Sequence, residues 1–282
     1  MKNLRIPQAI LITLVWLLAG CASGPPIDRS YTAVGQDSRA QFLILHYTAQ
    51  DFPTSLKALT QQGVSAHYLV RDEPPTIYQL VDENRRAWQA GVSSWKGQTQ
   101  LNAASIGIEI VNLGYRDMPE GRVYFDFPAP QIDAVIALVK KIVAEHRIPP
   151  ERVLGHSDIA PQRKPDPGPR FPWKRFADEG LIVWPDAALV AQQKPLYEQA
   201  LPSAEWFQLK LAKIGYAVPA TGELDIATLN VIAAFQMKYR PSVFTGIPDA
   251  ETAAMLDVLT APRNATSPAV LTPPPTTLPT GR

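Results

Sequence analysis

The sequence predicts an α/β domain, with a mixed central sheet flanked by helices, followed by a small all-α unit of three helices. In roughly the first two thirds of the chain, apolar runs of strand length alternate with stretches of helical periodicity, which is typical of a sheet with helices on its faces. Beyond a stretch rich in Ala, Gln and Pro, helical patterns separated by glycines follow. With 282 residues, 46% of them hydrophobic, the chain can bury one sizeable core and a second small one.

The elements of the first domain follow from these patterns. Strands are expected over residues 42–47, 66–71, 76–81 and 105–111, and helices over residues 53–62 and 130–147. The second helix has an apolar residue every three or four positions, which gives it one apolar face to lie on the sheet. These residues are Ile132, Val135, Ile136, Val139, Ile142 and Val143.

Changes in composition predict where the parts of the chain begin and end. We expect a signal peptide at residues 1–20, a tether at 21–38, the α/β domain at 39–185, a linker at 186–202, the helical unit at 203–260 and a disordered tail at 261–282. Helices of the unit are expected over residues 206–214, 227–239 and 250–259.

The N-terminus has the pattern of an exported lipoprotein. Lys2 and Arg5 precede an apolar run at residues 9–18, which is too short for a transmembrane helix and typical of a secretory signal. The run ends in LAGC, which resembles a bacterial lipobox, and Cys21 is the only cysteine of the chain, so it has no partner for an internal disulfide. We therefore expect lipidated Cys21 to anchor the protein to a membrane. By resemblance to Gram-negative lipoproteins, Ala22 favours the outer membrane, with the protein facing the periplasm.

The segment at residues 152–168, RVLGHSDIAPQRKPDPG, indicates a metal site. Its prolines and glycines argue against a helix or a strand, yet it contains His156 and Asp166, whose side chains are good zinc ligands. A catalytic zinc usually has three protein ligands and one open position. His46, in the apolar run FLILHYT, is the leading candidate for the third ligand because a buried strand delivers it at its end.

Three other residues compete for these roles. Asp158 is an alternative to Asp166, but its place before a turn suits a carboxylate that accepts hydrogen bonds from backbone N–H groups. His67, in a predicted strand, is expected to be a core residue satisfied by hydrogen bonds. His146 is expected to interact with the end of its helix or with solvent.

Amide hydrolysis at such a site requires two further groups. Zinc lowers the pKa of its bound water to about 7 and polarises a carbonyl, so it activates water for attack on an amide. Glu109 lies among isoleucines in IGIEI, where a carboxylate is costly unless it faces a cleft, and we predict it to be the acid/base group. Lys164 is predicted to stabilise the oxyanion of the tetrahedral intermediate.

These residues and motifs resemble the type 2 zinc N-acetylmuramoyl-L-alanine amidases, and in particular their lipoprotein branch. The resemblance covers residues 36–184 and rests on His46, on SIGIEIVN at 105–112 and on GHSDIAPQRKPDPGPRFPW at 155–173. It implies the type 2 amidase fold and hydrolysis of the amide between MurNAc and L-Ala of peptidoglycan stem peptides. The sequence leaves open whether the anhydro form of the sugar is also accepted. By position, the resemblance implies the zinc ligands His46, His156 and Asp166, the acid/base group Glu109 and the stabilising cation Lys164.

Two features qualify this resemblance. Many relatives have His where this chain has Gln89, a position that does not ligate the metal in the family, so we expect Gln89 to change substrate contacts. Residues 203–259 resemble the peptidoglycan-binding domain 1 family, which implies that the unit concentrates the enzyme at the wall. A helical bundle that only buttresses the first domain is the alternative.

The expected partners are peptidoglycan, muropeptides and, through Cys21, a membrane. A formal net charge of +1 without a basic stripe argues against nucleic acid, and we expect a monomer. Trp88 and Trp95 fall in a long loop, where they either stack on sugars or pin the loop. A non-catalytic peptidoglycan-binding lipoprotein with an amidase fold is the alternative function, but a pure binder has no need of all four residues His46, His156, Asp166 and Glu109.

Overall fold

The computed structural model describes residue 25 and residues 27–262. The chain divides into residues 1–37 and residues 38–282, and all the helices and strands given below lie in the second part. The predicted signal peptide, Cys21 and all but the first two residues of the predicted tail lie outside the described residues. Residues 27–37, in the predicted tether, contain no helix or strand. Within the described part of the chain, no helix is long and apolar enough to cross a membrane.

A five-stranded mixed sheet forms the centre of the first domain, as predicted. Its strands are β1 (Phe42–Tyr47), β2 (Tyr68–Val70), β3 (Ile77–Gln79), β6 (Ser105–Ile110) and β9 (Val153–Gly155). They lie in the order β3-β2-β6-β1-β9, with β3 antiparallel to β2 and the other pairs parallel. Strand β9 was not predicted, because we expected neither helix nor strand in residues 152–168. Three buried residues that pair with β1 are too few to give a periodic signal.

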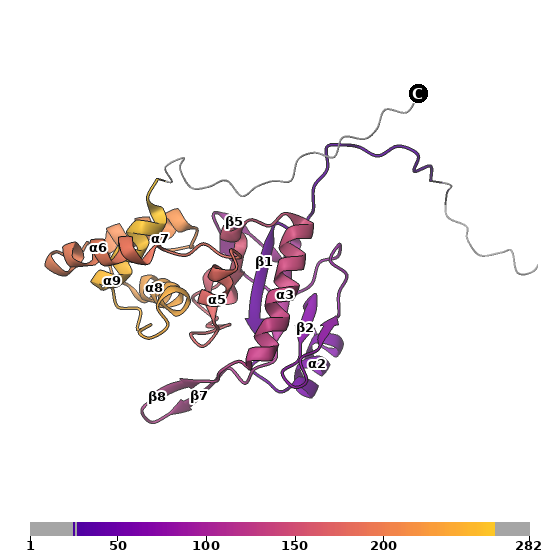
Figure 1. The fold of residues 1–282 in the computed structure, drawn as a ribbon, viewed down its shortest axis with the longest axis horizontal. Helices are drawn as coiled ribbons and strands as arrows, with labels where there is room; N and C mark the ends of the chain where they lie inside the picture. Colours follow the sequence, from indigo (N-terminus) through magenta and orange to yellow (C-terminus); the bar gives the residue numbers. More distant parts are fainter. Residues whose placement is uncertain (1–24, 26, 263–282) are drawn as a thin grey trace, which may run out of the picture. The chain divides into compact units, whose positions relative to one another are not determined.

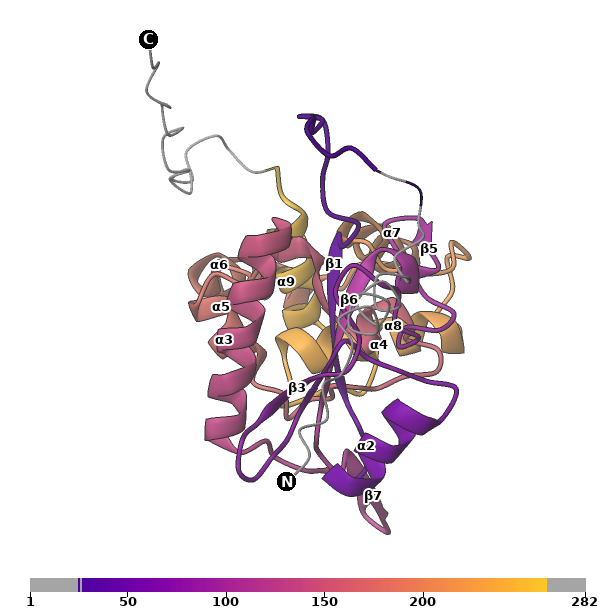
Figure 2. The ribbon, with the colours of Figure 1, turned by 90° about the vertical axis from the view of Figure 1, so that its right-hand side faces the viewer.

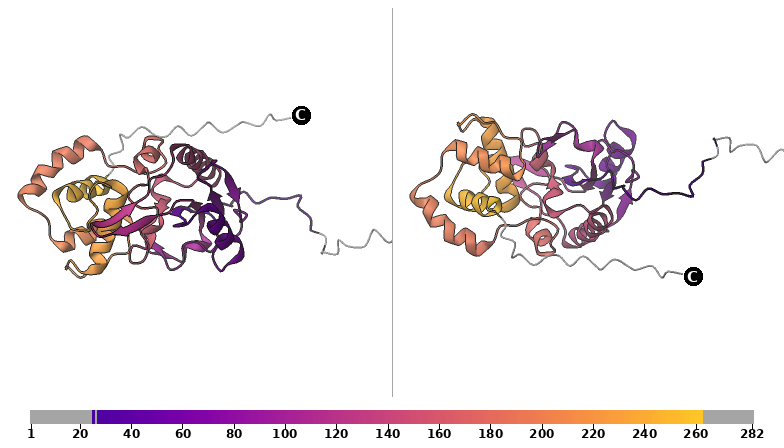
Figure 3. Two further views of the ribbon diagram at one scale, coloured as in Figure 1. Left: turned by 90° about the horizontal axis from the view of Figure 1, so that it is seen from below. Right: turned by 90° about the horizontal axis from the view of Figure 1, so that it is seen from above.

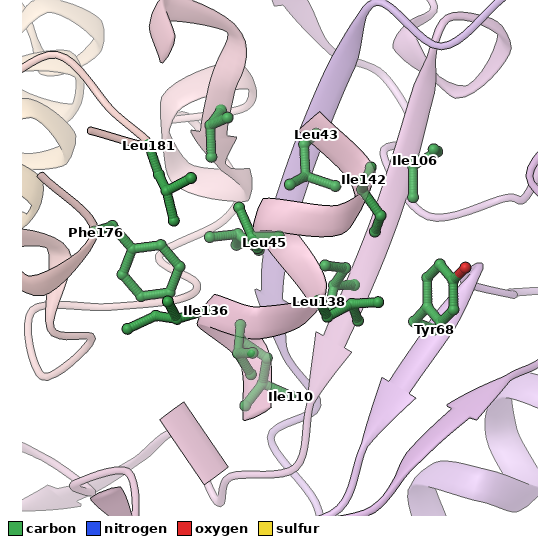
Figure 4. Close-up of a cluster of buried hydrophobic side chains, with 14 of the residues drawn as sticks. Leu43, Leu45, Tyr68, Ile106, Ile110, Ile136, Leu138, Ile142, Phe176 and Leu181 are labelled. Atoms are coloured by element: carbon green, nitrogen blue, oxygen red, sulfur yellow. The ribbon is translucent and has the colours of Figure 1, made fainter. Parts of the chain in front are cut away.

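Helix α3 (Ala129–His146) covers one face of this sheet (Figure 1). Its predicted apolar face is buried against every second residue of β1 and β6, among them Leu43, Leu45 and Ile106 (Figure 4). Helix α5 (Trp173–Asp178) adds Phe176 to the same core. Gln131 from α3 donates hydrogen bonds to backbone carbonyls at the ends of β2 and β6, which fixes the helix against the sheet.

The opposite face of the sheet is covered in two portions. Helix α2 (Phe52–Gln61) packs on the β2 side, across the sheet from α3 (Figure 2). On the β1 and β9 side, Phe42, Ile44 and Leu154 belong to an apolar cluster that contains Leu101 and Ile159 of the same domain and Phe207 and Phe235 of the helical unit. The α/β domain and the helical unit therefore share one apolar core.

The helical unit contains the three predicted helices and a fourth. In Figure 3 the orange and yellow helices of this unit lie together. They are α6 (Ala187–Gln199), α7 (Ala204–Ile214), α8 (Ile226–Tyr239) and α9 (Ala250–Thr260). Helix α6 occupies the stretch that we expected to be a linker. Asp186 caps it by accepting hydrogen bonds from the N–H groups of Ala188 and Leu189, alanine and glutamine favour helix, and α6 packs against α9.

Short elements complete the first domain. They are the hairpin β4 (Ser94–Trp95) and β5 (Gln98–Thr99), the hairpin β7 (Tyr115–Met118) and β8 (Gly121–Tyr124), two single turns at Leu101–Ala103 and Pro150–Arg152, and helix α4 (His156–Ile159). Helix α4 is a second departure from the expectation of neither helix nor strand in residues 152–168. It follows β9 directly, so the sheet places the start of α4 beside the carboxyl end of β1.

Candidate metal centre

The three predicted zinc ligands meet at the carboxyl end of β1. His46 Nδ1 lies 2.9 Å from His156 Nδ1 and 3.0 Å from Asp166 Oδ2, and His156 Nδ1 lies 3.1 Å from the same oxygen. All three residues are buried, with exposed fractions of 1%, 3% and 5%. Three donor atoms that converge in this way, two from imidazoles and one from a carboxylate, fit a three-ligand zinc site.

The outer nitrogens of both histidines have polar neighbours behind the site. His46 Nε2 lies 2.6 Å from Gln89 Oε1, and His156 Nε2 lies 3.2 Å from the carbonyl oxygen of Ala90. The amide oxygen of Gln89 is an acceptor, so His46 carries its proton on Nε2, and the lone pair of its Nδ1 is directed to the point where the three ligands meet. His156 Nε2 also lies 3.2 Å from Nη2 of Arg163, which is a donor, so these two neighbours hold the ring in place without selecting one tautomer.

Gln89 makes a contact that the sequence analysis did not predict. We expected it to change substrate contacts, which stays a prediction; in the structure it is 9% exposed and lies behind His46. Its amide donates to Ser105 Oγ at 2.8 Å, and this hydroxyl donates to the carbonyl of Leu101, so the amide oxygen must face His46. Gly107 makes room for this side chain, because a Cβ there would lie 2.5 Å from Gln89 Cγ. A glycine inside the strand was the signal that could have pointed to this close approach.

The surroundings of the site favour the metal-binding forms of Asp166 and His156, but not that of His46. Burial alone raises the pKa of Asp166, but His156 and His46 outweigh it and hold that pKa well below its usual range. Burial lowers the pKa of His156 and keeps this ligand neutral. For His46, burial is outweighed by Glu109 and Asp166, and its pKa is raised. A metal therefore competes with a proton at His46.

Glu109 lies beside His46 on the neighbouring strand β6, in direct register. Because alternate residues of a strand face opposite sides, Glu109 shares the face of Gly107 and His46 rather than that of α3. Its Oε2 is buried with no hydrogen-bond partner among the described residues. Burial raises the pKa of Glu109 to about 7, against the effect of His46 and Lys164. A partly buried carboxyl group that exchanges a proton near neutral pH suits acid/base catalysis.

Comparison with known proteins agrees with this geometry. Residues 36–169 match the model of a family described as N-acetylmuramoyl-L-alanine amidase. The amidase AmiD of Escherichia coli K12 is 42% identical to this chain over 267 residues, which cover 88% of this chain and 95% of AmiD. The chain belongs to the N-acetylmuramoyl-L-alanine amidase family. Residues 202–256 also match a family described as a putative peptidoglycan binding domain.

Solved structures of this amidase family have the same fold. AmpDh3 from Pseudomonas aeruginosa aligns with a TM-score of 0.77 and 41% identity, over 84% of this chain and 98% of AmpDh3. Escherichia coli AmiD in complex with anhydro-N-acetylmuramic acid-L-Ala-D-γ-Glu-L-Lys aligns with a TM-score of 0.74 and 40% identity, over 84% of this chain and 95% of that one. This chain is thus a zinc amidase with a helical peptidoglycan-binding unit.

A groove of about 470 Å³ opens beside Lys164 in this amidase. The β7–β8 hairpin contributes Tyr115 and Tyr124 to its lining, and the helical unit contributes Asn230 and Phe244. A second groove of about 440 Å³ shares Tyr124 and Phe244 with the first. The helical unit therefore forms part of the wall of the groove that contains Lys164.

The two other polar residues considered in the α/β domain have the structural roles that we predicted. His67 Nδ1 accepts from Gly107 N at 3.0 Å, and its Nε2 donates to a backbone carbonyl. Asp158 accepts from Gly155 N at 2.8 Å and so caps helix α4. Neither residue belongs to the group of converging donor atoms formed by His46, His156 and Asp166.

The expectation for His146 was wrong. Its Nδ1 lies 2.6 Å from Ser38 Oγ and its Nε2 lies 2.7 Å from Glu83 Oε2, so it joins the start of the domain to a loop instead of interacting with its own helix end or solvent. Of the two loop tryptophans, Trp95 is buried against Tyr216 and pins the loop, whereas Trp88 is exposed.

Proposed function

We propose that this amidase cleaves the bond between MurNAc and L-alanine with Glu109 as its acid/base group and Lys164 as its oxyanion-stabilising cation. The observation that carries the proposal is the buried, unpaired Oε2 of the partly buried Glu109, in register with His46. A purely binding protein has no need of an unpaired buried carboxylate beside a complete ligand set, because such a group destabilises the fold.

Each residue has a defined part in the reaction. His46, His156 and Asp166 hold the zinc, which when bound acidifies water and polarises the scissile carbonyl. Glu109 takes a proton from the attacking water and gives it to the nitrogen of L-alanine as that amine leaves. The ammonium group of Lys164 stabilises the negative charge that develops on the carbonyl oxygen.

The lining of the grooves supports a stem peptide as the leaving part of the substrate. Four cationic side chains, Arg122, Arg163, Lys164 and Arg170, are distributed over the two grooves, and the groove linings contain no Asp or Glu. Stem peptides carry free carboxylates, which such a surface attracts. The AmiD and AmpDh3 complexes contain anhydromuramyl peptides, so we include the anhydro sugar in the proposed substrate class.

Mass spectrometry of the products from purified muropeptides tests this proposal. Zinc-loaded protein should release intact peptides that begin with L-alanine, from both reduced and anhydro sugars, and His156→Ala should release none. Products cut within the peptide, or equal release by His156→Ala, would contradict it.

We also propose that the enzyme is an outer-membrane lipoprotein that faces the periplasm. The basis is the LAGC sequence at residues 18–21, which is followed by Ala22. Its Cys21 is the only cysteine of the chain. Because acyl chains contribute roughly 0.8 kcal/mol per buried CH₂, Cys21→Ala should shift the protein from the membrane fraction to the soluble fraction. Membrane retention of Cys21→Ala would count against a lipid anchor at this residue.

A further inference from the structure

A buried carboxylate joins helix α4 to the helical unit. Asp158, which is 1% exposed, accepts three hydrogen bonds. One comes from Gly155 N at 2.8 Å, within its own turn. The other two come from the helical unit: Tyr216 OH donates to Oδ1 at 2.6 Å, and Lys238 Nζ donates to Oδ2 at 2.8 Å.

Lys238, in helix α8 of the helical unit, is unusual because its charged side chain is buried. It is 4% exposed, and its ammonium group also lies 3.3 Å from the carbonyl oxygen of Val153 and 4.4 Å from the ring centre of Trp173. A buried ammonium group is costly unless it is paired and hydrogen-bonded. All of these partners belong to the α/β domain, so the pairing of Lys238 depends on contact between the helical unit and that domain.

Asp158 lies in the same short helix as the metal ligand His156, and this helix is hydrogen-bonded to Asp166. His156 is the first residue of α4, the helix that Asp158 caps, and so its backbone lies in the turn that Asp158 holds. The N–H of Ser157 donates to the carbonyl oxygen of Asp166 at 2.8 Å, which ties the other loop ligand to the same turn. A displacement of α4 would therefore move both His156 and Asp166, whereas His46 is held by the sheet.

We propose that Lys238 and Tyr216 are positioning residues of the zinc site: by holding Asp158, they fix the turn that places His156 and Asp166. The helical unit thereby acts on the metal centre in addition to any binding of the wall. The proposal rests on the proposed function only in taking these residues as metal ligands, and it does not depend on the substrate.

The test is the metal affinity of full-length Lys238→Met, Lys238→Arg and Tyr216→Phe. Residues that orient ligands typically contribute about 10- to 100-fold to metal affinity. We expect Lys238→Met to raise the zinc dissociation constant about tenfold, measured by competition with a chromophoric chelator, and to change the visible absorption spectrum of the cobalt(II)-substituted protein. Lys238→Arg, which keeps a donor cation, should restore much of the affinity. Tyr216→Phe keeps the packing and loses one hydroxyl, so we expect a smaller rise with the same spectral change.

Lys210→Met is the matched control. Lys210 also pairs with an aspartate, Asp257, at 2.6 Å and lies over a tryptophan ring, but it does so within the helical unit. Its loss should lower thermal stability and leave zinc affinity and the cobalt spectrum unchanged. A wild-type zinc affinity and cobalt spectrum in Lys238→Met would overturn the proposal. If Lys238→Met does not fold, the same result in Tyr216→Phe would overturn it. Failure of the metal site itself would be seen separately, as unchanged zinc affinity in His156→Ala.

Discussion

Replacing Glu109 by glutamine should stabilise the metal-free protein at neutral and alkaline pH. The reason is the burial of its carboxylate, which raises the pKa of Glu109 from 4.5 to about 7. Glutamine has nearly the same shape but no charge, so it occupies the same space without the cost of ionisation.

The sign of the pH dependence follows from where the proton is held. Between pH 4.5 and about 7, Glu109 keeps its proton in the folded protein and loses it in the unfolded chain. Unfolding then releases a proton, so the wild-type free energy of unfolding falls as pH rises through this window. Since one pKa unit corresponds to about 1.36 kcal/mol, the loss attributable to Glu109 is about 3 kcal/mol by pH 8. Glu109→Gln lacks this loss.

Urea denaturation of chelator-treated protein between pH 4 and pH 8 measures the effect. The stability of Glu109→Gln relative to wild type should increase with pH by about 3 kcal/mol. The control is Glu120→Gln, at an exposed position between β7 and β8, which should follow the wild-type curve. Parallel curves for Glu109→Gln and wild type would falsify the argument from burial. With zinc restored, Glu109→Gln should bind muropeptides but cleave them about 10²-fold or more slowly.

Three further changes test other parts of the structure. His156→Ala should lose both stoichiometric zinc, measured by atomic absorption, and activity, because two ligands make an inadequate site; full zinc occupancy would refute this ligand. Lys164→Ala should keep zinc and lower kcat about 10²-fold, and an unchanged kcat would assign oxyanion stabilisation to another group. A chain that ends at Pro185 should be unfolded or molten by circular dichroism, because it leaves the buried Asp158 without Tyr216 and Lys238, at a cost of about 3–5 kcal/mol; a cooperative melt would show that the domain is stable alone.

The cluster of His46, His156 and Asp166 could be predicted from the sequence because local patterns indicate the backbone conformation around each of these residues. His46 ends a buried strand, and His156 and Asp166 are ten residues apart in a segment stiffened by prolines. Glu109 was predicted because a carboxylate in an isoleucine-rich strand needs a reason to be there. In each case one residue conflicted with the local pattern, and the structure places all four together.

Residues that act through other residues were not predictable in the same way. Gln89 lies in a loop without periodicity, and only its contact with His46 reveals that it fixes a tautomer. Lys238 has the position of a surface cation on a helix, and its partner Asp158 lies 80 residues away in the sequence. Pairings of this kind depend on how two elements pack, and local patterns do not specify that.

The shared core, by contrast, had a signal in strand β1. In FLILHY the first four residues are apolar without alternation, which indicates a strand buried on both faces. Helix α3 covers the face with Leu43 and Leu45, while α2 packs on the β2 side. Phe42 and Ile44 therefore needed another cover, and their cluster contains side chains of the α/β domain itself, among them Leu101 and Ile159, together with Phe207 and Phe235 of the helical unit. A strand apolar on both faces thus indicates a second layer over the sheet, and the helical unit is joined to that layer through the shared cluster.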